Sequence, residues 1–576
     1  MRATASYPTL QVRRYLPKNF KVSTWEKLQP LLEELTNRTI SNTRELERWI
    51  LDRNEVEAAT IEEFGWRYIH LTRNASDEVA AKEYEAFVKN ISPKVSTYDH
   101  QLNLKLIHSP FLSDLEKPAY AIYLRGVRNA VELHNENNIT LSTAINMKSK
   151  EYGKVFADML VEIDGEHLTL QQTHTILEAT NRQKREQAYR ASYKRMRKDA
   201  SKIDAIFDTL LEKRHLIAQN SGFDNYRDYK FKALGRFDYT ATDCFDFHDS
   251  IKEEILPIVY QLQERRKAAL GVEQLRPWDL SVDISGRAPL QPFDNTDDLV
   301  HKSAKTLSAL EPFFGECLSI MRRMGHLDLE TREGKRPGGY NMPLVVTGVP
   351  FIFMNAANSI SDMRTLMHES GHAVHSFLTR DYRIVAYKRP PSEVAELAAM
   401  TMELLTLDYW KNFFEQREDL KRAKIWLLEN ILQLLPWIAT IDKFQHWLYT
   451  NPEHTPSERV AAWLRISHEF TAENMKKDDL RECTEYAWHR QLHIFEVPFY
   501  YIEYGMAQLG AIAIWKRYCE IGRKAVEDYS GALKLGYSRP IKEIYQTAGI
   551  EFNFSREYVR GLAKFLQEEL LKLYED

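Results

Sequence analysis

Cysteine, long apolar runs and an excess of one charge are what this sequence has least of. Its 576 residues include four cysteines, and no two of them are spaced as a C-x-x-C pair. This usage is typical of free thiols in a reducing compartment and offers no cysteine-based metal motif. No apolar run approaches the ~20 residues of a membrane-spanning helix, and the first nine residues lack the apolar stretch of a signal peptide. We therefore expect a cytoplasmic protein that does not enter a membrane.

Glycine and proline are also scarce, with 22 and 21 residues. Helical periodicity is widespread, and residues 506–515 favour a buried core helix. The most strand-like part is 338–358, where β-branched and aromatic residues are broken by Gly and Pro. The sequence predicts an almost all-α fold with a small sheet near residues 340–356. Amphipathic or buried helices are expected at 60–68, 79–88, 118–133, 201–221, 244–270 and 556–574.

The chain is longer than one ordinary hydrophobic core, so the sequence predicts more than one domain. We expect residues 1–200 to form an N-terminal helical domain and residues 201–576 to form the domain that does the chemistry. The sequence gives no indication of an oligomeric state.

Positive charge gathers in one segment only. The net charge is −4, which does not favour nucleic acid as a general partner. Residues 181–198 are strongly basic and contain Tyr189 and Tyr193, the pattern of a nucleic-acid-binding helix with stacking aromatics. The alternative is a solvated helix whose tyrosines pack inward. Because acids elsewhere balance the charge, we favour the second interpretation.

A His-Glu-x-x-His pattern is the most informative feature of the chain, at residues 368–372. On a helix His368 and His372 lie one turn apart on the same face, so both imidazoles can reach one zinc ion. Glu369 is then placed to deprotonate a zinc-bound water. The implied reaction is hydrolysis of a peptide bond. The alternative, two surface histidines on an ordinary helix, is disfavoured by the apolar residues on either side.

The third zinc ligand has several candidates. His375 shares the helix face, but it lies roughly 10 Å from His368 along the axis, whereas ligand atoms around one zinc lie about 3–3.5 Å apart. We expect His375 to pack behind the ligands. A second helix is predicted to start at Ser392, a good N-cap after two prolines. It contains Glu393, Glu396 and Glu403.

These three acids have different surroundings in the sequence. Glu393 falls in the first turn, where the helix dipole alone favours an acid. Glu396 lies among small apolar residues, so its carboxylate needs a partner, and we predict that it binds the metal. Glu403 lies seven residues further on the same face and is predicted to hold a ligand imidazole in place.

The set of motifs resembles the M3 family of zinc metallopeptidases, in particular the oligoendopeptidase F group. The resemblance rests on HESGHAVH at 368–375, the Glu of VAELAAMTME at 396, Asp362, the NYRDY run at 225–229 and GRFDYT at 235–240. It implies a two-lobed helical peptidase with a deep central cleft and one zinc ion. It also implies short peptides as substrates, with Asp362 near the ligands. Within the same superfamily, a peptidyl-dipeptidase is the alternative; outside it, a helical scaffold without activity.

A second cluster lies at 493–504 and contains one histidine and three tyrosines. Tyrosine hydroxyls are neutral donors that suit a developing oxyanion. The resemblance implies that Tyr504 is the catalytic tyrosine, that His493 assists it and that Tyr501 contacts the substrate. For Tyr500 two roles stay open, substrate binding and packing in the hydrophobic core.

Residues 351–355 shortly precede the zinc helix in the sequence. An edge strand there could bind a peptide by main-chain pairing, with Phe353 and Asn355 as substrate contacts, and the resemblance favours this role. The alternative is a structural hairpin.

Overall fold

The computed structural model describes residues 13–575. The first nine residues, on which the prediction about a signal peptide rests, lie outside this range. Helices dominate the described chain, and two small sheets accompany them. The predicted mainly α fold is therefore confirmed. Within residues 13–575, every helix is too short or too polar to cross a bilayer.

The chain divides into two compact units, each described here by itself. Unit 1 comprises Met1–Leu133, Gln291–Lys421 and Gly510–Phe552; unit 2 comprises His134–Leu290, Arg422–Leu509 and Asn553–Asp576. The boundary expected near residue 200 lies inside unit 2, because α6 (Glu136–Ala157) packs against α9 (Ala200–Asn220). The division at residue 200 stays a prediction from the sequence.

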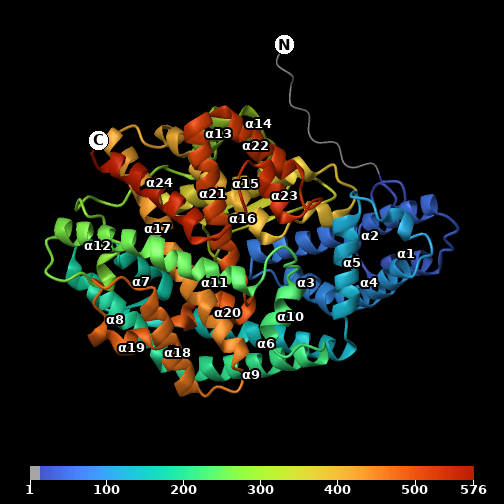
Figure 1. Cartoon of the computed structure of the whole chain (residues 1–576), viewed down its shortest axis with the longest axis horizontal. Coiled ribbons are helices and arrows are strands. Elements are labelled where there is room, and N and C mark those ends of the chain that lie inside the picture. Colours follow the sequence, from blue (N-terminus) through green and yellow to red (C-terminus); the bar gives the residue numbers. More distant parts are fainter. Residues whose placement is uncertain (1–12, 576) are drawn as a thin grey trace, which may run out of the picture. The chain divides into compact units, whose positions relative to one another are not determined.

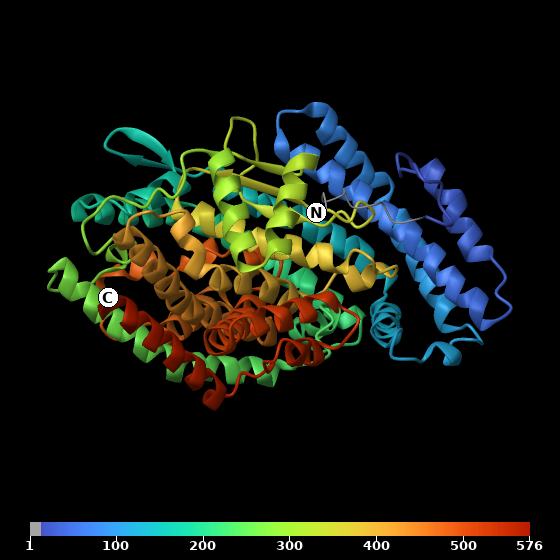
Figure 2. The same cartoon turned by 90° about the horizontal axis from the view of Figure 1, so that it is seen from above.

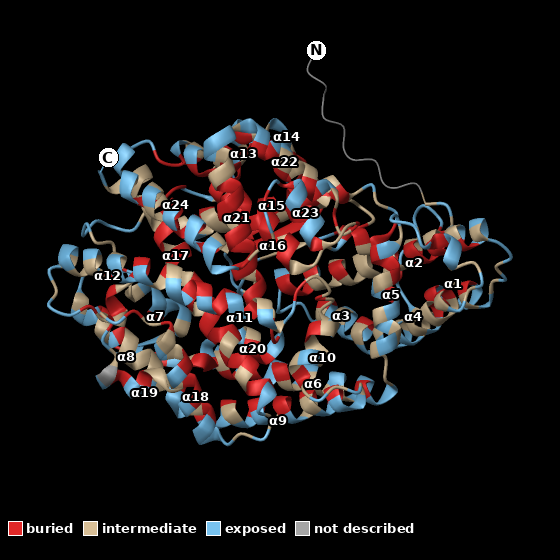
Figure 3. Ribbon diagram, in the orientation of Figure 1, coloured by how far each residue is buried: buried red, intermediate tan, exposed pale blue. Residues whose placement is uncertain are grey.

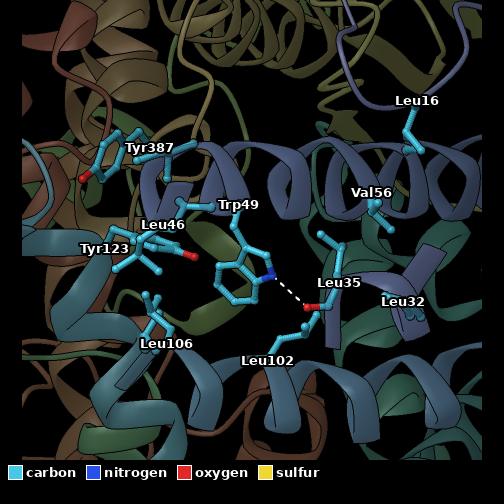
Figure 4. Packing of buried hydrophobic residues seen from close by; sticks show 14 of the residues in the cluster. Leu16, Leu32, Leu35, Leu46, Trp49, Val56, Leu102, Leu106, Tyr123 and Tyr387 are labelled. Carbon is cyan, nitrogen blue, oxygen red and sulfur yellow. Dashed lines mark hydrogen bonds between the residues drawn. The ribbon is translucent and has the colours of Figure 1, made fainter. Parts of the chain in front are cut away.

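The N-terminal helices of unit 1 enclose a hydrophobic core of their own. Leu46, Trp49 and Ile50 on α2 are fully buried there, and the indole of Trp49 donates to the backbone oxygen of Leu35 at 2.8 Å (Figure 4). Tyr387 of a later segment closes the same core. Figure 2 shows these helices in blue: α1 (Trp25–Asn37), α2 (Thr43–Arg73), α3 (Glu78–Asn90), α4 (Ser92–Ile107) and α5 (Ala121–Leu133).

The rest of unit 1 is built around two adjacent helices, α15 (Ile360–Thr379) and α16 (Ser392–Leu405) (Figure 1). Nearly all of α16 is buried (Figure 3). Gly371 permits this packing, since a Cβ there would lie 2.5 Å from the backbone oxygen of Ala398. The neighbouring elements are α13 (Thr296–Leu310), α14 (Pro312–Met324), η4 (Val385–Lys388), η5 (Leu407–Asn412), α22 (Arg523–Lys534) and α23 (Ile541–Thr547).

A three-stranded sheet in unit 1 precedes α15. Its order is β3 (Leu327–Glu330), β5 (Phe351–Ala356), β4 (Tyr340–Met342), with β3 parallel and β4 antiparallel to β5. The sheet confirms the strand prediction near 340–356, but β5 is the central strand. The prediction of an edge strand at 351–355 is wrong, because β3 supplies a partner whose sequence carried no clear strand pattern. The edge strand that contacts α15 is β4.

A buried ion cluster ties this sheet together. Asp328 on β3 is 6% exposed and accepts hydrogen bonds from Arg73, Arg332 and Lys335. Lys335 also donates to backbone oxygens of Glu330 and β5. Burial alone would raise the pKa of Asp328, but these cationic donors hold it well below its usual range.

Unit 2 is a helical assembly with one hairpin, β1 (Leu160–Ile163) with β2 (Glu166–Thr169). The predicted helix at 244–270 is interrupted by a π-helical turn, Ile251–Ile255, between α11 (Ala241–Ser250) and α12 (Leu256–Leu270). Further elements are α7 (Leu170–Ile176), α8 (Arg182–Lys198), α10 (Tyr226–Ala233), η3 (Pro277–Asp279), α18 (Pro456–Glu469), α19 (Arg481–Thr484), η7 (Ala487–Arg490), α20 (Leu492–Glu496) and α24 (Arg556–Glu575). Two long helices, α17 (Arg417–Thr450) and α21 (Tyr501–Ile521), contribute residues to both units.

The basic segment 181–198 is helix α8. Tyr189 and Tyr193 pack together and against a buried core that contains Trp278. Arg185 is buried and pairs with Asp279 at 2.9 Å. These contacts are those of a structural helix with inward tyrosines, the interpretation that we favour from the sequence.

Candidate metal centre

The helix that carries the HExxH pattern starts with a strong local signal. Ser359 caps α15 by accepting from the backbone N–H of Asp362, and Asp362 accepts in return from the Ser359 backbone at 2.9 Å. Asp362 also accepts from the backbone N–H of Ala357 at 2.8 Å. The structure therefore places Asp362 in the helix cap rather than beside the metal ligands, where we predict it from the sequence. It stabilises the start of the helix.

Three side chains converge near the middle of α15, two from this helix and one from α16. His368 and His372 lie on one face of α15, with ring centroids 5.0 Å apart. Glu396 reaches them from α16: its Oε2 lies 3.3 Å from Nε2 of His368 and 3.9 Å from Nε2 of His372. The helix starts at Ser392 with Pro391 in the cap position, so Ser392 is not the cap that we predict from the sequence.

The donor set fits a divalent cation. One ligand atom from each of His368, His372 and Glu396 lies within 4.8 Å of the other two, close to the separations around a single tetrahedral ion. Two imidazoles and one carboxylate with no thiolate are the donors of hydrolytic zinc sites, which leave the fourth position for water. These three residues would hold the metal.

Glu369 is buried beside this cluster with an uncommitted oxygen. Its Oε2 has no hydrogen-bond partner within residues 13–575, an arrangement that is costly unless the oxygen serves a ligand or a reaction. Burial raises the pKa of Glu369 to about 7, which suits a general base at neutral pH. Asn341 on β4 donates to the backbone oxygen of Glu369 at 3.2 Å and so fixes this turn of α15.

Glu403 orients His368 from behind. The Nδ1 of His368 lies 2.7 Å from Oε1 of Glu403, and Nε of Arg364 donates to its Oε2 at 2.6 Å. This is the contact that the predicted role of Glu403 requires. Burial alone would raise the pKa of Glu403, but the positive charges of Arg364 and His368 lower it. The carboxylate therefore stays ionised.

The surroundings of His368 and His372 shift their pKa values in opposite directions. For His368, burial lowers the pKa, but hydrogen bonds and charges from Glu396 and Glu403 outweigh burial and raise it to about 10. For His372, burial dominates and lowers the pKa to about 4. A metal that binds this site must therefore displace a proton from His368.

His375 lies on the same helix but not in the metal cluster. Its ring is 4% exposed, burial lowers its pKa to about 3, and it hydrogen-bonds the backbone of Leu533 on α22. This neutral histidine supports helix packing.

The two predicted substrate contacts on β5 make structural contacts instead. Phe353 is 1% exposed and stacks on Tyr340. Asn355 donates to backbone oxygens of Arg336 and Gly338 at 2.8 and 2.9 Å. Because β5 is also paired on both sides, we do not retain these residues as substrate contacts.

The histidine and tyrosine cluster belongs to unit 2 and is compact there. The ring of His493 lies 4.7 Å from that of Tyr501 and 6.0 Å from those of Tyr500 and Tyr504. The indole N–H of Trp437 donates to Oε1 of Gln491 at 3.0 Å, so the Gln491 amide nitrogen, 2.6 Å from Nδ1 of His493, is the donor there. The His493 proton is therefore on Nε2.

A strained residue positions the start of α21. Phe499 has φ of 66°, rare for a residue with a side chain. Its backbone N–H donates to Gln445 at 2.8 Å and its backbone oxygen accepts from Arg236. Arg236 also pairs with Glu503 at 2.8 Å. The GRFDYT motif thus holds the tyrosine segment in place.

Sequence reasoning missed four residues that shape these clusters. They are Arg364, Asn341, Gly371 and Gln491. Arg364 could have been predicted, since it precedes His368 by one helical turn and therefore lies on the same face of the helix. Gly371 occupies a variable position of HExxH, so the motif gives only weak reason to single it out. Asn341 and Gln491 depend on contacts with residues far away in the sequence, Glu369 and Trp437.

The mainly helical fold and a His-Glu-x-x-His helix completed by a carboxylate define the class of HExxH metallopeptidases. The profile of Peptidase family M3 matches residues 175–307 and 309–564, and that of the Peptidase M3 N-terminal domain matches residues 17–134. The chain belongs to peptidase family M3.

The relatives are named as oligopeptidases. Oligopeptidase PepF of Bacillus subtilis (strain 168) is 24% identical over 408 residues, 69% of this chain and 58% of that protein. Oligoendopeptidase F homolog of Lactococcus lactis subsp. lactis (strain IL1403) is 24% identical over 412 residues, 70% of this chain and 66% of that protein. The alignments thus span less than two thirds of either relative.

Among solved structures, PZ peptidase A with inhibitor 2 is similar with a TM-score of 0.89 and 28% identity, over 96% of this chain and 98% of that one. Oligoendopeptidase-F from Enterococcus faecium, 17% identical with a TM-score of 0.65, covers 96% of this chain and 97% of that one and shares the fold.

Proposed function

We propose that the protein is a zinc-dependent endopeptidase that hydrolyses short, unstructured oligopeptides. One observation supports this most strongly: the ligand atoms of His368, His372 and Glu396 converge beside the uncommitted, buried carboxylate of Glu369. The names of the relatives favour oligopeptides as the substrate class. Zinc is favoured over calcium or magnesium because two of the three ligands are imidazoles.

His368, His372 and Glu396 would hold a divalent cation, which would polarise the scissile carbonyl and acidify a water molecule when bound. Oε2 of Glu369 accepts the proton of that water and then delivers it to the leaving amine. Its pKa of about 7 allows both transfers near neutral pH. Glu403 keeps His368 in the ligand tautomer through Nδ1.

We further propose, from the family resemblance, that Tyr504 donates to the oxyanion, that His493 assists it and that Tyr501 contacts the substrate. Within unit 2, the amide of Gln491 supports this by leaving the proton of His493 on Nε2, where it can donate.

The test combines metal analysis with peptide cleavage. Purified protein is expected to contain zinc and to cleave an internally quenched peptide with a blocked C-terminus, and a chelator abolishes cleavage. Cleavage that requires a free C-terminus and releases dipeptides would instead identify a peptidyl-dipeptidase.

Glu369→Gln tests the assignment of the base. We expect bound metal to be retained while kcat falls by roughly 10²- to 10⁴-fold, because the amide cannot accept the proton. The exposed Glu415→Gln is the matched control and should keep full activity. Wild-type turnover in Glu369→Gln would exclude Glu369 as the base.

A further inference from the structure

A second group of metal-ligand side chains lies in unit 2, on helices α11 and α17. Cys244 and His248 are one turn apart on α11, and Asp442 and His446 are one turn apart on α17. Residues four apart share a helix face, so each helix presents a pair. The four residues are 0%, 1%, 0% and 4% exposed in that order.

The carboxylate of Asp442 lies close to both histidines. Oδ2 of Asp442 lies 2.9 Å from Nε2 of His248 and 3.1 Å from Nε2 of His446. One ligand atom each of Cys244, Asp442 and His446 lies within 4.8 Å of the other two. Around a tetrahedral zinc ion, with bonds of about 2.0–2.3 Å, ligand atoms are about 3.3–3.6 Å apart. An ion at this site would therefore move the imidazoles of His248 and His446 slightly away from Asp442.

His248 and Asp442 are hydrogen-bonded to each other at 2.9 Å, but other polar atoms of the two histidines and of Asp442 lack partners in the described part of the chain. Within residues 13–575, neither ring nitrogen of His446 has a hydrogen-bond partner, although Nε2 is close to Asp442. Oδ1 of Asp442 and Nδ1 of His248 also lack one. Buried polar atoms without partners destabilise the fold, and bonds to a cation would satisfy those that point at it.

We propose that Cys244, His248, Asp442 and His446 bind a second divalent metal ion of the zinc class. A thiolate, a carboxylate and two neutral imidazoles cancel the charge of such an ion, so the complex can be buried without net charge. The thiol of Cys244 loses its proton to solvent on binding. Four protein ligands leave no open position, so this site is structural and does not hydrolyse peptides.

The location gives this ion a role in unit 2. Gln445, beside His446, holds the backbone N–H of Phe499 at 2.8 Å, and the ring of His446 lies 5.3 Å from that of Phe499. The ion would fix the turn of α17 that keeps Phe499 in its strained conformation, directly before the tyrosine cluster.

Cobalt substitution tests the site without relying on activity. The peptidase ligands include no sulfur, so a thiolate-to-cobalt charge-transfer band in the near ultraviolet cannot come from that centre, and cysteine variants assign it. We expect cobalt-loaded wild-type protein to show this band and to hold two ions per chain. Cys244→Ser should lose the band, while Cys483→Ser, also buried in unit 2, should keep it. His372→Ala should lose the peptidase ion and keep the band.

Fully loaded wild-type protein with one ion per chain, or with no thiolate band, would overturn the proposal, and this measurement needs no variant to fold. A band that persists in Cys244→Ser would overturn it as well. The hydrogen-bonded His248–Asp442 pair would then be a metal-free structural contact.

Discussion

Nδ1 of His368 donates to Glu403 at 2.7 Å, and this bond joins the helix of the HExxH pattern to the helix of the third ligand. Because Nδ1 is engaged, Nε2 is the nitrogen that faces Glu396, 3.3 Å away. Arg364 holds the second oxygen of Glu403, so the orientation of His368, a proposed metal ligand, depends on two residues outside the proposed ligand set.

Glu403→Gln is therefore expected to lower the affinity for zinc by about 10- to 100-fold. The amide can still accept from Nδ1, but it lacks the charge that makes the imidazole a better ligand. Competition with a chromophoric chelator measures the affinity, and Glu415→Gln serves as the control. Unchanged affinity would show that Glu403 only supports packing.

Gly371→Ala should disrupt the metal centre through the backbone. Its Cβ would lie 2.5 Å from the oxygen of Ala398 and 2.6 Å from Cα of Ala399, so α16 must shift and carry Glu396 away. We expect a loss of stability of about 1–3 kcal/mol together with weaker zinc binding. Gly126→Ala, in a helix of the same unit with no heavy atom within 4 Å of the new Cβ, should be neutral or stabilising. If both variants bind zinc normally, the close approach is not required.

Tyr504→Phe is expected to lower kcat by roughly 10²- to 10³-fold, the loss seen when one donor to an oxyanion is removed. Tyr501 is hydrogen-bonded to Gln491 and Trp437 within unit 2, and burial raises its pKa to about 12. Tyr501→Phe should therefore change KM more than kcat. Steady-state kinetics on one quenched peptide compares the two. The reverse pattern would exchange the roles of these tyrosines.

Asp328→Asn should destabilise the sheet of unit 1 by about 3 kcal/mol at pH 7, because three cationic partners lose a buried carboxylate. The folded pKa of Asp328 lies below its unfolded value. Its contribution is thus fully present above about pH 5 and is lost as the pH falls below the unfolded pKa of about 3.9. Urea unfolding at several pH values should show the difference between wild type and variant shrinking in acid. A constant difference would rule out the ionised carboxylate as its cause.

The sequence could predict elements whose cause is local. Helical periodicity located the buried helix at 506–515, which lies within α21, and the strand-like residues near 340–356 became β4 and β5. The spacing of His368 and His372 and the apolar surroundings of Glu396 predict a cluster that the fold brings together.

Long-range pairing could not be predicted in the same way. The central position of β5 depends on β3, four residues with no alternating pattern in LDLE. The prediction that Asp362 lies near the ligands rests on the family resemblance, whereas in the structure its carboxylate faces the start of the helix. Gln491 acts on His493 only because Trp437, on another helix, fixes its amide.

The hydrogen bond from Asn341 to the main chain of Glu369 connects the small sheet to the helix that carries the HExxH pattern. The edge strand β4 thus restrains the peptide unit that carries the proposed base. We expect the position of that carboxylate to depend on the sheet as well as on its own helix.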